Sequence, residues 1–166
     1  LPISFAALTG SADQARKILV GLQEFSGKSS FGFDTLQGAA RNMLNFGVEA
    51  EKVLPLMQQL GAIASGDADR LDRLAVAFGQ TQAKGRLMAE EVRQMVNAGF
   101  NPLQEIARTT GKSMADLLVD MEAGRVSAQQ VAKSFETVTS AGGRFATVLA
   151  KIQGTATGQF RQALAS

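Results

Sequence analysis

Cysteine, histidine, tryptophan and tyrosine are all absent from this chain of 166 residues. Without cysteine there is no disulfide framework, thiolate metal site or cysteine nucleophile. Without histidine there is no histidine triad or histidine metal site, and the usual general base near pH 7 is missing. The ten phenylalanines leave few platforms for stacking single-stranded nucleic acid. The composition therefore favours a structural or interaction module, and we expect no catalysis, no metal and no cofactor.

Long apolar runs are missing as well. No stretch approaches the roughly 18 apolar residues that a membrane-spanning helix needs, and no charged segment followed by an apolar one marks a signal peptide. The chain begins at Leu1, without methionine, and stops within a helical pattern over residues 159–166. We therefore expect it to be a piece of a longer protein.

The charge of the chain is close to balanced. Seventeen basic and fifteen acidic residues give a net charge of +2, which is too small for a protein that holds a phosphate backbone. From Gly124 onward there are five basic residues and one acidic residue, a net charge of +4, whereas the remainder of the chain carries −2. An acidic partner would suit this part, but its charges are spread out, which favours an ordinary solvated helix surface.

Apolar residues recur at helical spacing along almost the whole chain, and no lasting alternation of the strand type occurs. The pattern predicts an all-α fold of seven to ten short helices in a compact bundle. Pro55 should kink or restart the helix that begins near Glu49, because proline lacks a backbone donor. The residues expected to be buried in the N-terminal helices include Leu19, Met43, Leu60, Leu74 and Phe78.

Short polar side chains precede several of these helical stripes, where they can accept hydrogen bonds from the first backbone amides. A proline at a first helical position and a glutamine three residues after a serine strengthen two of these starts. The expected starts are Ser11, Asp67 or Asp69, Asn101 with Pro102, Ser113, and Ser127 with Gln130.

Two glycine-rich segments interrupt the helical stripes, as hinges between lobes do. Residues 79–85 contain two glycines among polar residues, and the pair Gly142 and Gly143 follows a later helix. Phe145 should be the first buried residue of the helix that resumes after this pair. The expected parts are an N-terminal helical lobe (1–85), an inserted small helical lobe (86–141) and returning C-terminal helices (142–166).

Two short motifs look like ligand sites but fit helix ends better. Residues 110–113 imitate the end of a phosphate-binding loop, but the glycine that this motif requires five residues before Gly111 is replaced by Ile106. The three aspartates within residues 67–72 lack the later glutamate of a calcium loop and suit a helix N-terminus. Both segments are therefore interpreted as helix ends.

Neither the paired acids nor the short helices of the central region favour a specific activity. Glu90 and Glu91 diverge by about 100° on a helix, so they cannot flank one substrate bond as a glycosidase pair does. They are interpreted as first-turn acids. The helices between Met88 and Met121 have helix-turn-helix spacing, but the second, over residues 103–108, has few polar residues for reading base edges.

Six short elements, five of which contain glycine, together resemble the tape measure domain of tailed-bacteriophage tail proteins, in both order and spacing. The resemblance runs from about Leu22 to the end of the chain, and its most distinctive elements are Gly-Gly-x-Phe at 142–145 and Thr-x-Thr-Gly at 155–158. The elements lie at residues 79–87, 91–94, 97–103, 124–126, 140–145 and 155–158. Their structural, hinge or packing positions are Gly79, Gly85, Gly99, Pro102, Gly124, Gly142, Gly143, Phe145, Thr155, Thr157 and Gly158.

The resemblance implies a long, mostly helical phage protein that occupies the lumen of the growing tail while tube subunits polymerise around it until its length is matched. The chain would be one folded domain of this scaffold. Its partners would be tail tube and tail tip proteins, tail assembly chaperones and further copies of itself, with no specific nucleic acid. It would lie in the virion tail, and in the host cytoplasm during assembly; membrane contact would be confined to DNA delivery by the full-length protein.

Two other functions stay open from the residues alone. One is a helical interaction adaptor unrelated to phage, and the other is a carboxylate-dependent cell-wall hydrolase, for which the sequence offers no convincing pair of acids. One segment also departs from the family pattern. Residues 29–33 read Ser-Ser-Phe-Gly-Phe where a Thr-Pro-Phe-like entry to a helix is expected.

Overall fold

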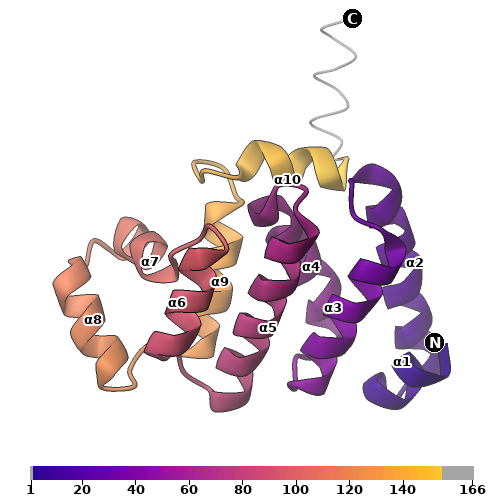
Figure 1. The fold of residues 1–166 in the computed structure, drawn as a ribbon, viewed down its shortest axis with the longest axis horizontal. Helices are drawn as coiled ribbons and strands as arrows, with labels where there is room; N and C mark the ends of the chain where they lie inside the picture. The colour runs from indigo at the N-terminus through magenta and orange to yellow at the C-terminus, as the bar shows by residue number, and fades with distance from the viewer. Residues whose placement is uncertain (1, 155–166) are drawn as a thin grey trace, which may run out of the picture.

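The computed structural model describes residues 2–154, which form ten α-helices and no strand (Figure 1). The expected all-α fold is confirmed. No helix within these residues is both long enough and apolar enough to cross a bilayer. The helices are α1 (Pro2–Thr9), α2 (Ala12–Lys28), α3 (Phe33–Asn45), α4 (Ala50–Ala64), α5 (Ala68–Lys84), α6 (Ala89–Asn97), α7 (Pro102–Thr110), α8 (Met114–Glu122), α9 (Ala128–Val138) and α10 (Ala146–Gln153).

Helices α2 to α5 stand side by side, with α1 beside α2 at one end of the molecule and α8 at the opposite end (Figure 1). Helix α9 contacts α4 and α5 as well as α7, so it connects the N-terminal helices with the short central ones. The last helix, α10, lies across the ends of the upright helices and contacts α2 and α4 (Figure 1). After α9, the chain therefore returns to its N-terminal helices.

A single apolar cluster runs through the fold, from Phe5 in α1 to Ile152 in α10. Phe135 of α9 is buried at a junction of this cluster. Its ring meets the ring of Phe78 in α5 edge-on, with the centroids 5.4 Å apart, and it lies at the same separation from the ring of Phe100, which follows α6. These contacts join the central helices to the N-terminal helices through one shared core.

Most of the predicted core positions are confirmed. Leu19 is the exception, because the buried face of α2 runs through Ile18 and Leu22 and leaves Leu19 half-buried at its edge. Helix α1 was not predicted, since its residues are apolar nearly throughout and show no amphipathic stripe. The confirmed core positions are Met43, Leu60, Leu74 and Phe78.

Neither Pro55 nor Gly79 ends a helix. Pro55 lies inside α4, which continues from Ala50 to Ala64 without a restart. Gly79 lies inside α5, where a Cβ would come within 2.4 Å of Cδ2 of Phe46. The absence of a side chain at this position lets the Phe46 ring pack against the helix backbone. In sequence, this packing glycine was mistaken for a break in the helix.

The predicted helix starts are confirmed by their capping hydrogen bonds. Asp67, and not Asp69, caps α5, because its Oδ1 accepts hydrogen bonds from the amides of Asp69 and Arg70 at 3.0 and 3.1 Å. Gly85 and Gly111 end α5 and α7 with φ values of +78° and +77°, a conformation that favours glycine. The capping residues are Ser11, Asp67, Asn101, Ser113 and Ser127, the last in a complete capping box with Gln130.

Candidate functional site

Four of the elements that carry the resemblance are far apart in sequence, but the structure brings them together in two pairs. In the first pair, the amide of Leu87 donates to the carbonyl oxygen of Val126 at 2.8 Å, and the amide of Ala128 donates to that of Gly85 at 3.2 Å. These bonds hold together the points where the chain leaves α5 and enters α9. We call these two segments, residues 85–87 and 126–128, the neck.

Gly124 lies just before the neck and has two structural reasons to be glycine. Its φ is +74°, which L-residues rarely adopt. A Cβ there would also come within 3.3 Å of Cδ of Arg86, so the arginine side chain passes closely over the backbone at this position. Both residues line a surface cavity of about 310 Å³ between the start of α6 and the end of α8.

Arg144 joins the second pair of elements. Its Nη2 donates a hydrogen bond to the carbonyl oxygen of Gly99 at 3.0 Å. Its guanidinium lies over the ring of Phe145, 4.6 Å from the ring centroid, in a cation–π contact. Phe145 forms the N-cap of α10 and is half-buried, so the prediction that it is buried holds only in part. The loop before α10 thereby contacts the loop between α6 and α7.

Two adjacent glycines let the chain turn back onto the end of α9. Gly142 has a φ of +87°, and a Cβ at Gly143 would lie 2.3 Å from the carbonyl oxygen of Val138. The amide of Phe145 donates to the same carbonyl oxygen at 2.9 Å. A larger residue at Gly143 would therefore push the turn away from α9 and displace Arg144 with it.

These motif residues line a cavity of about 460 Å³ between α7, the end of α9 and the loop that precedes α10. This volume lies in the range of small-ligand sites. Arg108 and Arg144 bring two guanidinium groups to the wall, and Phe100 and Val138 give it an apolar part. We call it the α7–α9 cavity. Its other lining residues are Asn101, Gln104, Glu105, Gly142 and Gly143.

The carboxylate in this wall is held in place by three hydrogen bonds. Glu105 is 6% exposed and accepts from Nε and Nη2 of Arg108, at 2.8 and 2.6 Å, and from the hydroxyl of Thr137 at 2.6 Å. Burial raises the pKa of the Glu105 carboxyl. The hydrogen bonds from Arg108 and Thr137, with the nearby positive charges, outweigh burial, so this pKa lies below its ordinary value. Glu105 therefore stays ionised at neutral pH and ties α7 to α9.

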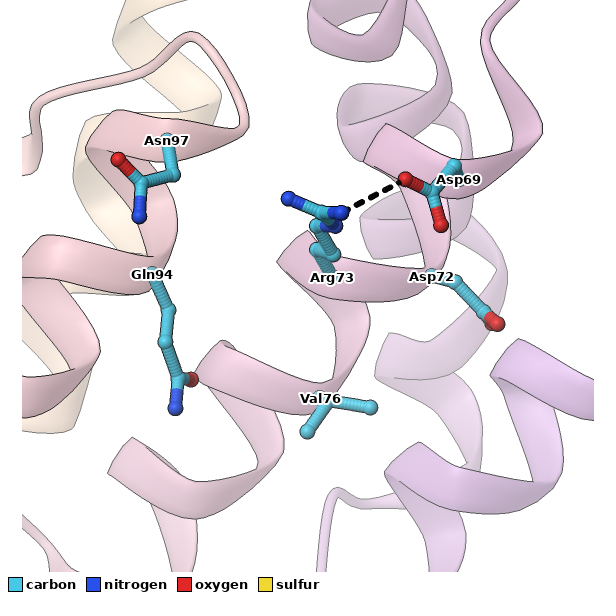
Figure 2. Close-up of a pocket in the computed structure, with 6 residues that line it drawn as sticks. All are labelled: Asp69, Asp72, Arg73, Val76, Gln94 and Asn97. Atoms are coloured by element: carbon cyan, nitrogen blue, oxygen red, sulfur yellow. Dashed lines mark ion pairs between the residues drawn. The ribbon is translucent and has the colours of Figure 1, made fainter.

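A second groove, of about 400 Å³, lies between α5 and α6 (Figure 2). Asp69 and Arg73 of α5 form an ion pair at 3.0 Å, and Gln94 and Asn97 extend from α6 on the other side (Figure 2). Of its lining residues, Gln94 and Asn97 belong to the elements of the resemblance. Because its arginine is already paired within α5, we regard the α7–α9 cavity as the candidate site.

A family model described as "Tape measure protein" matches the chain from residue 1 to residue 166, which is its whole length. The chain belongs to the tape measure protein family. No curated protein and no solved structure matches it significantly. This family consists of structural phage tail proteins and is not an enzyme family. The chain is therefore a structural component of a phage tail, and its partners are other tail components.

One buried ion pair of this tape measure chain was missed in the sequence. Glu91 is in the first turn of α6, as predicted, but it is fully buried, and its Oε2 accepts a hydrogen bond from Nζ of Lys84 at 2.9 Å. The signal was present, because Glu91 lies four and seven residues before Met95 and Ala98, on the buried face of the helix. An acid in line with an apolar stripe indicates a buried ion pair.

The remaining tape measure motif positions fall at helix boundaries or outside the described residues. Gly99 has a φ of +97° between α6 and α7, and Pro102 is the first residue of α7. Within residues 2–154, no group of three or more acidic side chains is placed to hold a metal ion. The positions Thr155, Thr157 and Gly158 lie outside the residues that the structure describes.

Proposed function

We propose that the chain is a folded domain of a tape measure protein that acts as a scaffold inside the polymerising tail tube, and that it does not itself measure length. The family match over the whole chain carries this proposal. A ruler needs an extended element, and 166 residues of continuous helix would span about 250 Å. The longest described helices, α2 and α5, have 17 residues each and span about 25 Å. A domain of short, packed helices suits the start of assembly, packing in the tube or release.

The proposed partners are tail tube and tail tip proteins and tail assembly chaperones, together with further copies of the chain. Their place is the virion tail, and the host cytoplasm during assembly. Within this proposal the glycines of the motif have structural roles. Gly85 and Gly124 allow the chain to form the neck, and Gly142 and Gly143 allow the turn before α10. The neck and the turn together hold the central helices α6 to α8 against α9.

The hydrolase alternative has no support from the buried acids. A general acid of a cell-wall hydrolase needs a carboxyl whose pKa is raised. The pKa of Glu105 is shifted the opposite way, and its carboxylate is occupied by Arg108 and Thr137. The carboxylate of Glu91 is fully buried beside Lys84 and has no access to a polymer.

Tail length in engineered phage tests this function. Deleting a stretch of extended helix elsewhere in the parent protein should shorten the tails by about 1.5 Å for each residue removed. Deleting residues 1–166 should instead give no tails or non-infective tails, because assembly fails. Regular tails that are shorter by an amount proportional to the deleted 166 residues would show that this domain does measure length, and would contradict the proposal.

A further inference from the structure

Arg144, which lines the α7–α9 cavity, has hydrogen-bond donors that no residue of the described chain occupies. An arginine has five N–H donors, and the structure gives Arg144 one hydrogen bond, to the carbonyl oxygen of Gly99. Within the part of the chain that the structure describes, no carboxylate lies within ion-pair distance of it. Its contacts with Gly99 and with the ring of Phe145 fix the guanidinium in place at the wall of the cavity.

Arg108 of α7, on the other side of the cavity, is also held in place, in its case by a carboxylate. Two of its donors form the bidentate pair with Glu105, and its side chain is 48% exposed, so the others remain accessible. Glu105 neutralises one of the two guanidinium charges, which leaves the lining of the cavity with a net charge of +1. When other contacts already hold the guanidinium group of an arginine, the side chain loses little further entropy on binding an oxyanion.

The rest of the lining fits a peptide better than a phosphate polymer. Phe100 and Val138 offer an apolar wall beside the arginines, and the side-chain amide of Gln104 offers both a donor and an acceptor. Nucleic acid needs several phosphate contacts, and the net charge of the whole chain is only +2. The part of the chain from Gly124 onward, which includes Arg144, has a net charge of +4.

We propose that the α7–α9 cavity binds an acidic peptide segment of another tail protein, with an Asp or Glu carboxylate between Arg108 and Arg144. An apolar side chain next to that carboxylate packs on Phe100 and Val138. This inference rests on the proposed function for the class of partner, and the site itself rests on the geometry of the cavity. The chain thereby docks onto its partner through the turn at Gly142 and Gly143.

A peptide array on the purified chain tests the site. The probes are capped pentapeptides with Asp or Glu at the centre and varied neighbours, beside matched peptides with Asn or Gln at the centre. We expect saturable binding of acidic peptides with an apolar neighbour, at least tenfold tighter than their amide counterparts. The amide NMR signals of Gly142 and Gly143 should shift on binding. If no acidic peptide binds better than its amide counterpart, or if inorganic phosphate competes at equal concentration, the proposal is wrong.

Matched variants locate the binding. Arg144→Gln should weaken binding of the best acidic peptide about tenfold, because a charged hydrogen-bonded pair is lost. Arg144→Lys, which keeps the charge without the planar fork, should lie between Arg144→Gln and the original chain. Arg93→Gln removes the same charge from an exposed position of α6 outside the cavity and should change binding less than twofold. Equal weakening by Arg93→Gln and Arg144→Gln would overturn the site. This outcome is independent of tail length, so it leaves the scaffold function standing.

Discussion

The guanidinium of Arg144 donates a hydrogen bond to the carbonyl oxygen of Gly99, 45 residues earlier in the chain, at 3.0 Å. This contact connects the Gly-Gly-x-Phe element with the element at residues 97–103. Next to it, Glu105 connects α7 to Thr137 of α9. The motif residues of this tape measure chain therefore act where helices meet, and the predictions below test these joints and the core between them.

The first prediction concerns the junction of the core at Phe135. Phe135→Ala should lower the free energy of unfolding by about 3–5 kcal/mol, because it removes a fully buried ring that packs on Phe78 and Phe100. Val20→Ala is the control, because Val20 is 47% exposed, and it should cost less than about 0.5 kcal/mol. Urea unfolding followed by circular dichroism measures both. A similar small loss in the two variants would show that Phe135 is not central to the core.

The second prediction separates a packing glycine from an ordinary helical one. Gly79→Ala should destabilise the fold by about 1–3 kcal/mol, because the new Cβ would collide with Phe46. Gly38→Ala, inside α3 with no atom within 4 Å of the new Cβ, should stabilise it by about 0.5–1 kcal/mol. The same urea titration gives both values. Stabilisation by both substitutions would mean that Phe46 does not pack closely on α5.

Helical periodicity predicted the fold class because an amphipathic helix repeats its buried side chains every three or four residues, as α5 does at Leu71, Leu74 and Phe78. It missed α1, where nearly every residue is apolar and no stripe stands out. It also misinterpreted Gly79, because a glycine at a helix contact and a glycine at a hinge look alike. The distinction depends on Phe46, which belongs to another part of the chain.

Little of the candidate site could be predicted from the sequence. Arg144 donates to a backbone carbonyl, and every residue type has one, so the sequence does not indicate which residue is its partner. The contact between Glu105 and Thr137 was not predicted, because the two residues are 32 positions apart and meet only through the packing of α7 on α9. The glycine pair before Phe145 was predicted to interrupt the helical pattern. Its contact with Val138, however, requires the turn to be seen in space.

The third prediction concerns pH. The pKa of Glu105 is lower in the folded protein than its ordinary value of 4.5, so its ionisation favours folding at higher pH. This contribution is lost as the pH falls below about 4.5 and through the lower pKa of the folded state. Glu105→Gln should therefore be less stable than the original chain at pH 7, and the difference should shrink towards pH 3. The urea midpoint at each pH measures it.

An exposed acid serves as the control for the pH dependence. Glu24 lies on the exposed side of α2, and Glu24→Gln should leave the midpoints at pH 7 and pH 3 close to those of the original chain. A constant difference between Glu105→Gln and the original chain across this pH range would show that the charge of Glu105 does not stabilise the fold.

The fourth prediction concerns the inserted lobe. We propose that residues 86–141 move as a unit about two joints, the end of α5 at Gly85 and the turn at Gly142 and Gly143. Amide hydrogens of residues 142–144 should exchange faster than those of α9 and α10. In the neck, Leu87 and Ala128 should exchange more slowly than that turn, because their amides donate hydrogen bonds to the carbonyl oxygens of Val126 and Gly85. Uniform protection across both joints and the helices they connect would contradict the movement.

The last prediction links the fold of the domain to tail assembly, through the helix that closes it. Phe145 is a poor target, because it is only half-buried and an aspartate there would lie beside the guanidinium of Arg144. Leu149→Asp is better, since Leu149 is buried where α10 lies on α2 and α4, and the substitution places a charge there. Phage with this change should have absent or non-infective tails, and no tails of a new regular length.

Thr147→Asp is the matched control, because it adds the same charge to an exposed position of the same helix, in the first turn, where an acid is favourable. These phage should form infective tails of normal length. Electron micrographs and plaque counts of the two mutants decide the outcome, since both carry the same added side chain on α10 and differ in burial. Normal, infective tails in the Leu149→Asp phage would mean that the fold of this domain is dispensable for assembly. Equal loss of tails in both mutants would mean that the surface of α10, and not its packing on α2 and α4, is what assembly requires.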